Sequence, residues 1–152
     1  MNSKKELYSK LIPKVSALID VNVNIIANLA NISAVLKEEL DCLWVGFYLV
    51  EENQLVVGPY QGPVACTKIE YGRGVCGKCW ELKEAIVVDD VDLYEDHISC
   101  SADSRSEIVV PVFDSNNNVK MVLDIDSVDL AAFDAEDKTG LVSIASLITA
   151  LL

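Results

Sequence analysis

Four of the five cysteines lie in one 35-residue span, and their thiols are the side chains best suited to chemistry. The span contains Cys66, Cys76, Cys79 and Cys100, together with the only histidine, His97. Concentrated thiols are typical of redox catalysis or of metal binding, although buried cysteines also serve as small hydrophobic side chains. The elements that position these thiols have to distinguish the three interpretations.

Metal binding is the weaker of the two chemical interpretations. Cys76 and Cys79 have the spacing of metal ligands, and His97 and Cys100 would complete a zinc site with three cysteines and one histidine. The pattern of a zinc deaminase fails because Val75 precedes the first cysteine and the histidine lies downstream. A thioredoxin-like disulfide would need a parallel βαβ setting, which is missing. We therefore expect no resident metal, with structural zinc as a lesser alternative.

Composition describes an ordered, acidic chain of one domain. It has 152 residues, 51% of them hydrophobic, and a net charge of −12. No basic stripe is present to neutralise phosphates, so we expect no nucleic acid partner and no membrane partner. The first six residues are polar, and no apolar run of about 18 residues occurs that would suggest a membrane span. We expect a cytoplasmic location, where clustered cysteines are more often catalytic, redox-active or metal-bound than structural disulfides.

Hydrophobic periodicity predicts an α+β fold, with strand hairpins between terminal helices. Helices are expected in the N-terminal segment 1–40, with a start or kink near Pro13 and a break at 22–24, and over 75–83 and 134–152. Strands are expected over 43–50, 55–60, 64–69, 85–88, 107–113 and 119–126. Residues 92–106 should form a long loop, and Asp134 should cap the last helix. The sheet and pocket loops then occupy residues 43–126, and the terminal helices pack on one face of a mostly antiparallel sheet.

Alternation along two strands predicts which face of the sheet does chemistry. Trp44 and Tyr48 share one face of the first strand, and Asp124 and Asp126 share one face of the last. Their apolar neighbours should meet the helices, so this polar and aromatic set should lie on the opposite face. A solvated outer face is the alternative, but tryptophan and mid-strand aspartates are poor choices for one. We expect a pocket with aromatic walls and a carboxylate floor.

Short motifs in this order resemble the free methionine-(R)-sulfoxide reductases, which are single GAF-domain enzymes. The resemblance covers about residues 40–150 and rests on 44–48 (WVGFY), 58–62 (GPYQG), 65–66 (AC), 72–77 (GRGVCG), 97–100 (HISC), 106–109 (SEIV) and 123–127 (LDIDS). It implies that one GAF domain, residues 1–152, reduces free L-methionine (R)-S-oxide to L-methionine. It also implies thioredoxin as the external reductant and no cofactor.

The resemblance also assigns roles by position. Cys100 matches the nucleophile, and Cys66 and Cys76 match the two other redox cysteines, either of which would resolve the intermediate. Cys79 departs from the family pattern.

The substrate-binding set implied by the resemblance combines three carboxylates, Glu107, Asp124 and Asp126, with the aromatic residues Trp44 and Tyr48. Three carboxylates close together do not all ionise easily, so at least one should hold a proton and serve as an acid. The others would pair with the ammonium group of a free amino acid.

A GAF domain that senses a small ligand or redox state without turnover is the alternative function. The chain offers no separate output domain, which counts against this alternative. We also expect that a homodimer could form through the terminal helices, because GAF domains often pair in this way. His97 is expected to be a hydrogen-bonding loop residue rather than a base.

Overall fold

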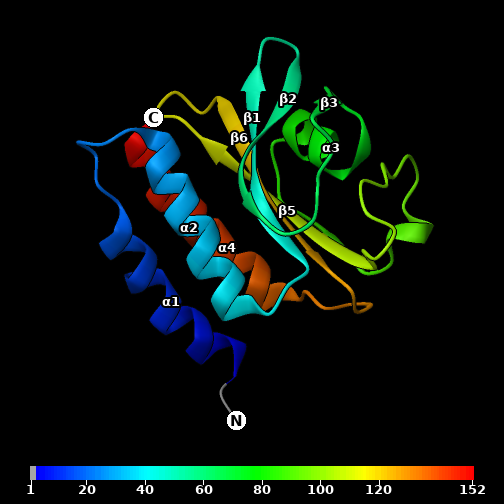
Figure 1. Cartoon of the computed structure of the whole chain (residues 1–152), viewed down its shortest axis with the longest axis horizontal. Helices are drawn as coiled ribbons and strands as arrows, with labels where there is room; N and C mark the ends of the chain where they lie inside the picture. Colours follow the sequence, from blue (N-terminus) through cyan, green and yellow to red (C-terminus); the bar gives the residue numbers. More distant parts are fainter. Residues whose placement is uncertain (1–2) are drawn as a thin grey trace.

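The computed structural model describes residues 3–152 (Figure 1). Met1 and Asn2, which belong to the predicted N-terminal helical segment, lie outside the described residues. The helices are α1 (Lys4–Leu18), α2 (Ile25–Leu40), α3 (Gly74–Leu82) and α4 (Ala135–Ile148). The strands are β1 (Trp44–Glu51), β2 (Gln54–Gln61), β3 (Lys68–Glu70), β4 (Ile86–Val88), β5 (Ser106–Phe113) and β6 (Val119–Ser127). Short 3-10 turns follow at Val91–Leu93 and Thr149–Leu151.

Within residues 3–152 the strands form one six-stranded sheet in the order β3-β2-β1-β6-β5-β4. Every neighbouring pair is antiparallel. The two central strands, β1 and β6, come from opposite halves of the chain and pair from Trp44 with Asp126 to Leu49 with Met121. The α+β fold and the antiparallel sheet expected from the sequence are confirmed.

Helices α2 and α4 cover one face of the sheet, α1 packs on the outside of these two helices, and α3 lies on the other face of the sheet (Figure 1). Val45, Phe47, Leu123 and Ile125 point from the central strands into the core beneath the three helices. The side chains of Trp44, Tyr48 and Val122 point to the opposite face and belong to a second cluster, which packs against α3. The assignment of the two sheet faces from period-two alternation is therefore confirmed.

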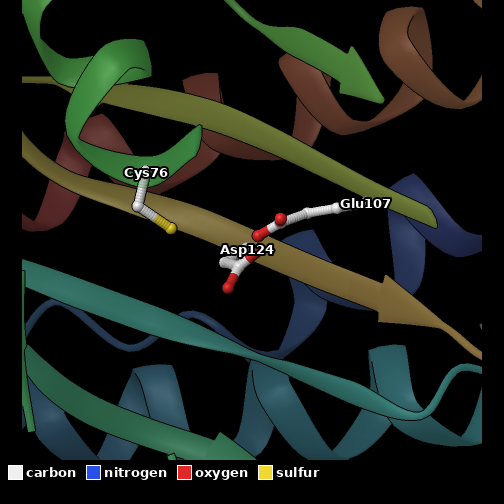
Figure 2. A group of neighbouring side chains, drawn as sticks. All are labelled: Cys76, Glu107 and Asp124. Atoms are coloured by element: carbon white, nitrogen blue, oxygen red, sulfur yellow. The ribbon is translucent and has the colours of Figure 1, made fainter. Parts of the chain in front are cut away.

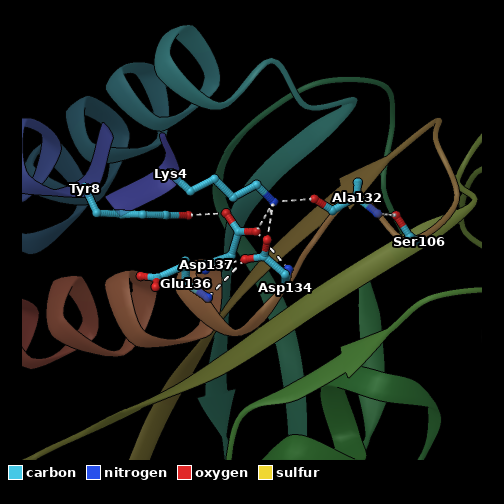
Figure 3. Close-up of polar contacts among 7 residues, drawn as sticks. All are labelled: Lys4, Tyr8, Ser106, Ala132, Asp134, Glu136 and Asp137. Atoms are coloured by element: carbon cyan, nitrogen blue, oxygen red, sulfur yellow. Dashed lines mark hydrogen bonds and ion pairs between the residues drawn. The ribbon is translucent and has the colours of Figure 1, made fainter. Parts of the chain in front are cut away.

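A buried polar network ties α1 to the start of α4 (Figure 3). Tyr8 donates its hydroxyl proton to Oδ1 of Asp137 across 2.8 Å, and Lys4 forms an ion pair with the same carboxylate. Asp134 caps α4 and accepts hydrogen bonds from the backbone N–H groups of Glu136 and Asp137. The cap predicted at Asp134 is confirmed, and its capping box satisfies backbone donors that the helix leaves open.

The boundaries of the first two helices differ from the prediction in one respect. The break predicted at 22–24 is confirmed, because α1 ends at Leu18 and α2 begins at Ile25 after the cap Asn24. Of the start or kink predicted near Pro13, the start is wrong, because α1 begins at Lys4 and runs through this residue. Ser9 and Pro13 are both exposed, so the Ser9 carbonyl that the proline leaves without a helical hydrogen bond is on the solvent side of the helix.

The strand predicted over 64–69 is also wrong for most of its length. Only Lys68–Glu70 pairs with β2, and residues 64–67 form a loop. Tyr48 donates its hydroxyl proton to the carbonyl of Cys66 across 3.0 Å. In a strand, this carbonyl would instead accept a hydrogen bond from the backbone N–H of a neighbouring strand. This loop, rather than a strand, brings Cys66 to the pocket.

Candidate active site

A pocket opens on the sheet face that carries α3, between the sheet, α3 and the loop before β5, and its empty volume including the mouth is about 550 Å³. Its lining includes seven of the eight residues predicted for the site: Trp44, Tyr48, Cys76, Cys100, Glu107, Asp124 and Asp126. The eighth, Cys66, is bonded to Cys100. The residues predicted from separate segments of the sequence therefore come together at one pocket.

Aromatic rings form one wall of the pocket. The ring of Trp44 stacks on Tyr48 at a centroid distance of 5.8 Å and on Tyr60 at 5.0 Å. The indole N–H of Trp44 donates to the carbonyl of Pro63 across 3.1 Å, which fixes the ring edge. Tyr60 was not among the predicted site residues, although it pairs with Gly46 in the register of β1 and β2.

Gly46 allows this stacking because it leaves room beside Tyr60. A Cβ atom at position 46 would lie 2.2 Å from the Cβ of Tyr60 and 2.7 Å from its Cα. Real Cβ atoms do not approach other atoms so closely, and the nearest atoms belong to the partner strand's backbone and stem. The glycine therefore lets β1 and β2 pair while three aromatic rings stack on one face.

Carboxyl groups form the floor of the pocket. Asp124 and Asp126 alternate along β6, and Glu107 of β5 pairs in register with Asp126. Glu107 and Asp124 are each 5% exposed, whereas Asp126 is partly open to the pocket. Oδ1 of Asp126 accepts a hydrogen bond from the hydroxyl of Ser104 across 3.3 Å, a contact that the sequence did not suggest.

Burial and mutual repulsion keep protons on these carboxyl groups. Burial, followed by the charge of Asp126, raises the pKa of Glu107 to about 8. Burial also raises the pKa of Asp124 and of Asp126 well above the ordinary range, with Glu107 and Asp124 as the respective neighbouring charges. At neutral pH the floor therefore contains carboxylic acids that can donate protons.

His97 lies closer to this chemistry than its sequence context suggested. Its Nε2 is 3.7 Å from Oε1 of Glu107, and the ring lines the pocket. Burial lowers the pKa of His97, which favours the neutral imidazole near pH 7. The side chain therefore adds a polar wall but no fixed positive charge.

A disulfide bond joins Cys66 to Cys100, which lie 34 residues apart, with their Cα atoms 5.3 Å from each other. Both cysteines are half-buried at the pocket mouth. The loop that carries Cys100 is held by a two-pronged ion pair of Arg73 with Asp96, with both nitrogen–oxygen distances at 2.8 Å. The structure thus brings together two of the three cysteines that were predicted to exchange electrons.

Cys76 remains a thiol and lies deeper in the pocket. It stands in the first turn of α3, and its sulfur points toward the carboxyl groups of Glu107 and Asp124 (Figure 2). One ligand atom from each of these three residues lies within 4.8 Å of the others. Burial, and next the charge of Asp124, raises the pKa of the Cys76 thiol. Of the described residues, this set is the one best placed to hold a metal ion.

The other thiols lie outside this set. Cys42 and Cys79 are buried and free, and burial raises the pKa of both. The zinc site considered from the CxxC spacing needs Cys100 as a thiolate, and the bond to Cys66 occupies that sulfur. Cys79 therefore has no role in the redox pair or in the pocket lining.

Comparisons with known proteins agree with this geometry. A GAF domain family model matches residues 29–152. GAF domain-containing protein A of Dictyostelium discoideum is 48% identical over 147 residues, which cover 96% of this chain and 92% of that protein. The free methionine-R-sulfoxide reductase of Escherichia coli is 44% identical over 140 residues, which cover 91% of this chain and 84% of the enzyme.

A solved structure gives the same result in three dimensions. The free methionine-R-sulfoxide reductase of Neisseria meningitidis, in complex with its substrate, superposes with a TM-score of 0.94 and 46% identity. The match covers 99% of this chain and 92% of that one. Fold, pocket and sequence relatives together show that this chain belongs to the free methionine-R-sulfoxide reductase family of GAF-domain proteins.

Proposed function

We propose that this protein reduces free L-methionine (R)-S-oxide to L-methionine, with Cys100 as the nucleophile and thioredoxin as the external reductant. The observation that carries the proposal is the Cys66–Cys100 disulfide at the mouth of a pocket floored by protonated carboxyl groups. A sulfoxide reductase needs both parts: a pair of thiols that supplies two electrons and an acid that protonates the sulfoxide oxygen. The identity of the substrate is inferred from the relatives that are free methionine-R-sulfoxide reductases.

Recognition of a free amino acid follows from the charge of the pocket. Of the described residues that line it, none is lysine or arginine, whereas Glu107, Asp124 and Asp126 all are part of it. An ammonium group entering this site would favour ionisation of the carboxyl groups that it contacts and would form charge-assisted hydrogen bonds with them. The stacked rings of Trp44 and Tyr48 offer an apolar wall for the side chain of the substrate. A peptide-bound methionine lacks the free ammonium group, so it should be a poor substrate.

The chemistry balances with the groups present. A carboxylic acid of the floor protonates the sulfoxide oxygen, which makes the sulfur electrophilic, and the Cys100 thiolate attacks. Methionine leaves, and the oxygen remains on Cys100 as a sulfenic acid. The Cys66 thiol then condenses with the sulfenic acid, which forms the disulfide and releases water. A dithiol such as reduced thioredoxin exchanges with this disulfide and is itself oxidised.

Cys66 rather than Cys76 is the resolving thiol in this proposal. The bond between Cys66 and Cys100 supports that choice, because its formation needs no movement of the deeper thiol. Cys76 is buried among carboxyl groups, and its raised pKa disfavours the thiolate needed to attack a sulfenic acid.

The assay couples methionine sulfoxide reduction to NADPH oxidation through thioredoxin and thioredoxin reductase, with both epimers, free and peptide-bound. We expect turnover of the free R epimer, none after Cys100→Ser, and normal turnover after Cys42→Ser, a buried thiol on the helix side. Cys66→Ser should release one methionine per chain and then stop. Absence of NADPH oxidation by the wild-type protein would refute the proposal and favour a sensor that binds without turnover.

A further inference from the structure

We propose that Cys76, Glu107 and Asp124 form a binding site for a thiophilic divalent cation of the zinc type. The three residues come from α3, β5 and β6, and their side chains converge in Figure 2. A sulfur and two carboxyl oxygens lie within 4.8 Å of one another, and all three residues are buried. The site is a separate property from the redox pair, because none of its ligands belongs to the disulfide.

A second observation points to a missing ligand at the same place. Oδ1 of Asp124 is buried and has no hydrogen-bond partner among the described residues. Asp124 is 95% buried, since its exposed fraction is 5%, and it lines the pocket. Buried carboxylate oxygens in native proteins are almost always paired. A ligand in the pocket that binds Oδ1 of Asp124 would supply the missing partner.

The chemistry of the ligand set favours a soft cation. Magnesium and calcium take six or more oxygen ligands and do not select sulfur, whereas zinc binds thiolate, carboxylate and imidazole together. Zinc–sulfur bonds of about 2.3 Å and zinc–oxygen bonds of about 2.1 Å place tetrahedral ligands roughly 3.5 Å apart. The ligand atoms, which lie within 4.8 Å of one another, would therefore have to approach by about 1 Å to hold a tetrahedral ion.

Within residues 3–152, the lining of the pocket also lacks a basic side chain that would repel a cation. The lining of the pocket contains three carboxyl groups, and of its described residues none is lysine or arginine. His97 lies beside this set, with its Nε2 atom 3.7 Å from Oε1 of Glu107. With three protein ligands, the fourth position of a tetrahedral ion would face the pocket and be open to water.

Occupation of this site has a consequence that rests on the proposed function. The substrate ammonium group would use Asp124 and Glu107, so the cation and the substrate compete for the same carboxyl groups. Zinc or cadmium would thus inhibit the enzyme reversibly while leaving the thiols of Cys66 and Cys100 unmodified.

The test uses cobalt(II) as a spectroscopic substitute for zinc, added to metal-free protein in which the Cys66–Cys100 disulfide is intact. Because the disulfide occupies these two sulfurs, neither of them can bind cobalt as a thiolate, and the protein does not turn over substrate during the measurement. We expect one equivalent of cobalt to bind with a thiolate-to-cobalt charge-transfer band in the near ultraviolet. Cys76→Ser should abolish the band, whereas the matched controls Cys79→Ser and Cys42→Ser should keep it.

A second variant protects the test against misfolding. Glu107→Gln preserves shape but replaces an ionisable oxygen ligand by a neutral amide, so cobalt affinity should fall at least tenfold while circular dichroism remains that of the wild type. A wild-type protein without saturable cobalt binding would overturn the proposal, and so would a band that survives Cys76→Ser. Because the measurement contains no substrate and no reductant, its outcome is independent of whether the protein reduces methionine sulfoxide.

Competition is measured in the Cys66→Ser/Cys100→Ser double variant, which lacks the redox thiols. Free methionine (R)-sulfoxide should displace cobalt from this protein and reduce the band. Persistence of the band at saturating sulfoxide would refute the shared use of the carboxyl groups.

Discussion

Replacing Glu107 by glutamine should stabilise the folded protein while impairing the reaction. The side chain is 5% exposed, and its pKa is raised from 4.5 to about 8, first by burial and then by the charge of Asp126. Glutamine has nearly the same shape but carries no ionisable group. The variant therefore removes the electrostatic cost of this carboxyl group without opening a cavity.

The size of the effect follows from proton linkage. A folded state that binds a proton more tightly than the unfolded state loses stability as the pH rises from the unfolded pKa to the folded pKa, here from 4.5 to about 8. Holding that proton at pH 7, about 2.5 units above the unfolded pKa, costs about 3 kcal/mol. Glu107→Gln should be more stable than the wild type by this amount at pH 7, and about equal to it at pH 4.

Urea unfolding of the disulfide form at both pH values measures the difference. The melting temperature at pH 7 should rise by about 6–12 °C for a chain of this length. Glu51→Gln, an exposed change at the end of β1, is the matched control and should shift neither value. Equal stability of Glu107→Gln and the wild type at pH 7, or a gain independent of pH, would refute the argument that this carboxyl group is held protonated by burial.

Two further changes test the scaffold. Gly46→Ala would place a methyl group 2.2 Å from the Cβ of Tyr60, so the β1–β2 pair must separate; urea unfolding should show a loss of about 2–3 kcal/mol. Gly58→Ala, whose nearest contact would be 3.1 Å away, is its control and should cost less. Tyr8→Phe removes the hydroxyl that donates to Asp137 across 2.8 Å, and should lower the free energy of unfolding by about 1–2 kcal/mol. An unchanged free energy in Tyr8→Phe would contradict a net stabilising contribution of this hydrogen bond.

The sheet and its two faces could be predicted because local alternation is sufficient for both. Trp44 and Tyr48 on β1, like Asp124 and Asp126 on β6, share a face through the period of two, whatever the partner strand. Glu107 was added by the family resemblance rather than by alternation, and the β5–β6 register places it opposite Asp126. The parts of the site found by alternation required only the strand assignments to be right.

The loops could not be predicted in the same way, because contacts between distant segments determine their conformation. The pairing of Cys66 with Cys100 depends on a side chain of β1 that holds the first loop, and on an ion pair of Arg73 that holds the second. Neither contact leaves a pattern in the spacing of the cysteines. The same reason explains why Val64 and its neighbours resembled a strand and are a loop.

The pairing of β1 with β6 has a consequence for how the protein is made. Trp44 lies beside Asp126, 82 residues later in the chain, so the centre of the sheet joins segments that leave the ribosome far apart in time. Nonlocal pairings of this kind fold slowly. Until β6 emerges, the β1–β2 hairpin exposes Phe47 and an unpaired edge, which is the condition under which nascent chains aggregate or recruit chaperones. The aromatic wall of the pocket is thus synthesised well before its carboxylate floor, and neither half can form the pocket until β6 has been synthesised.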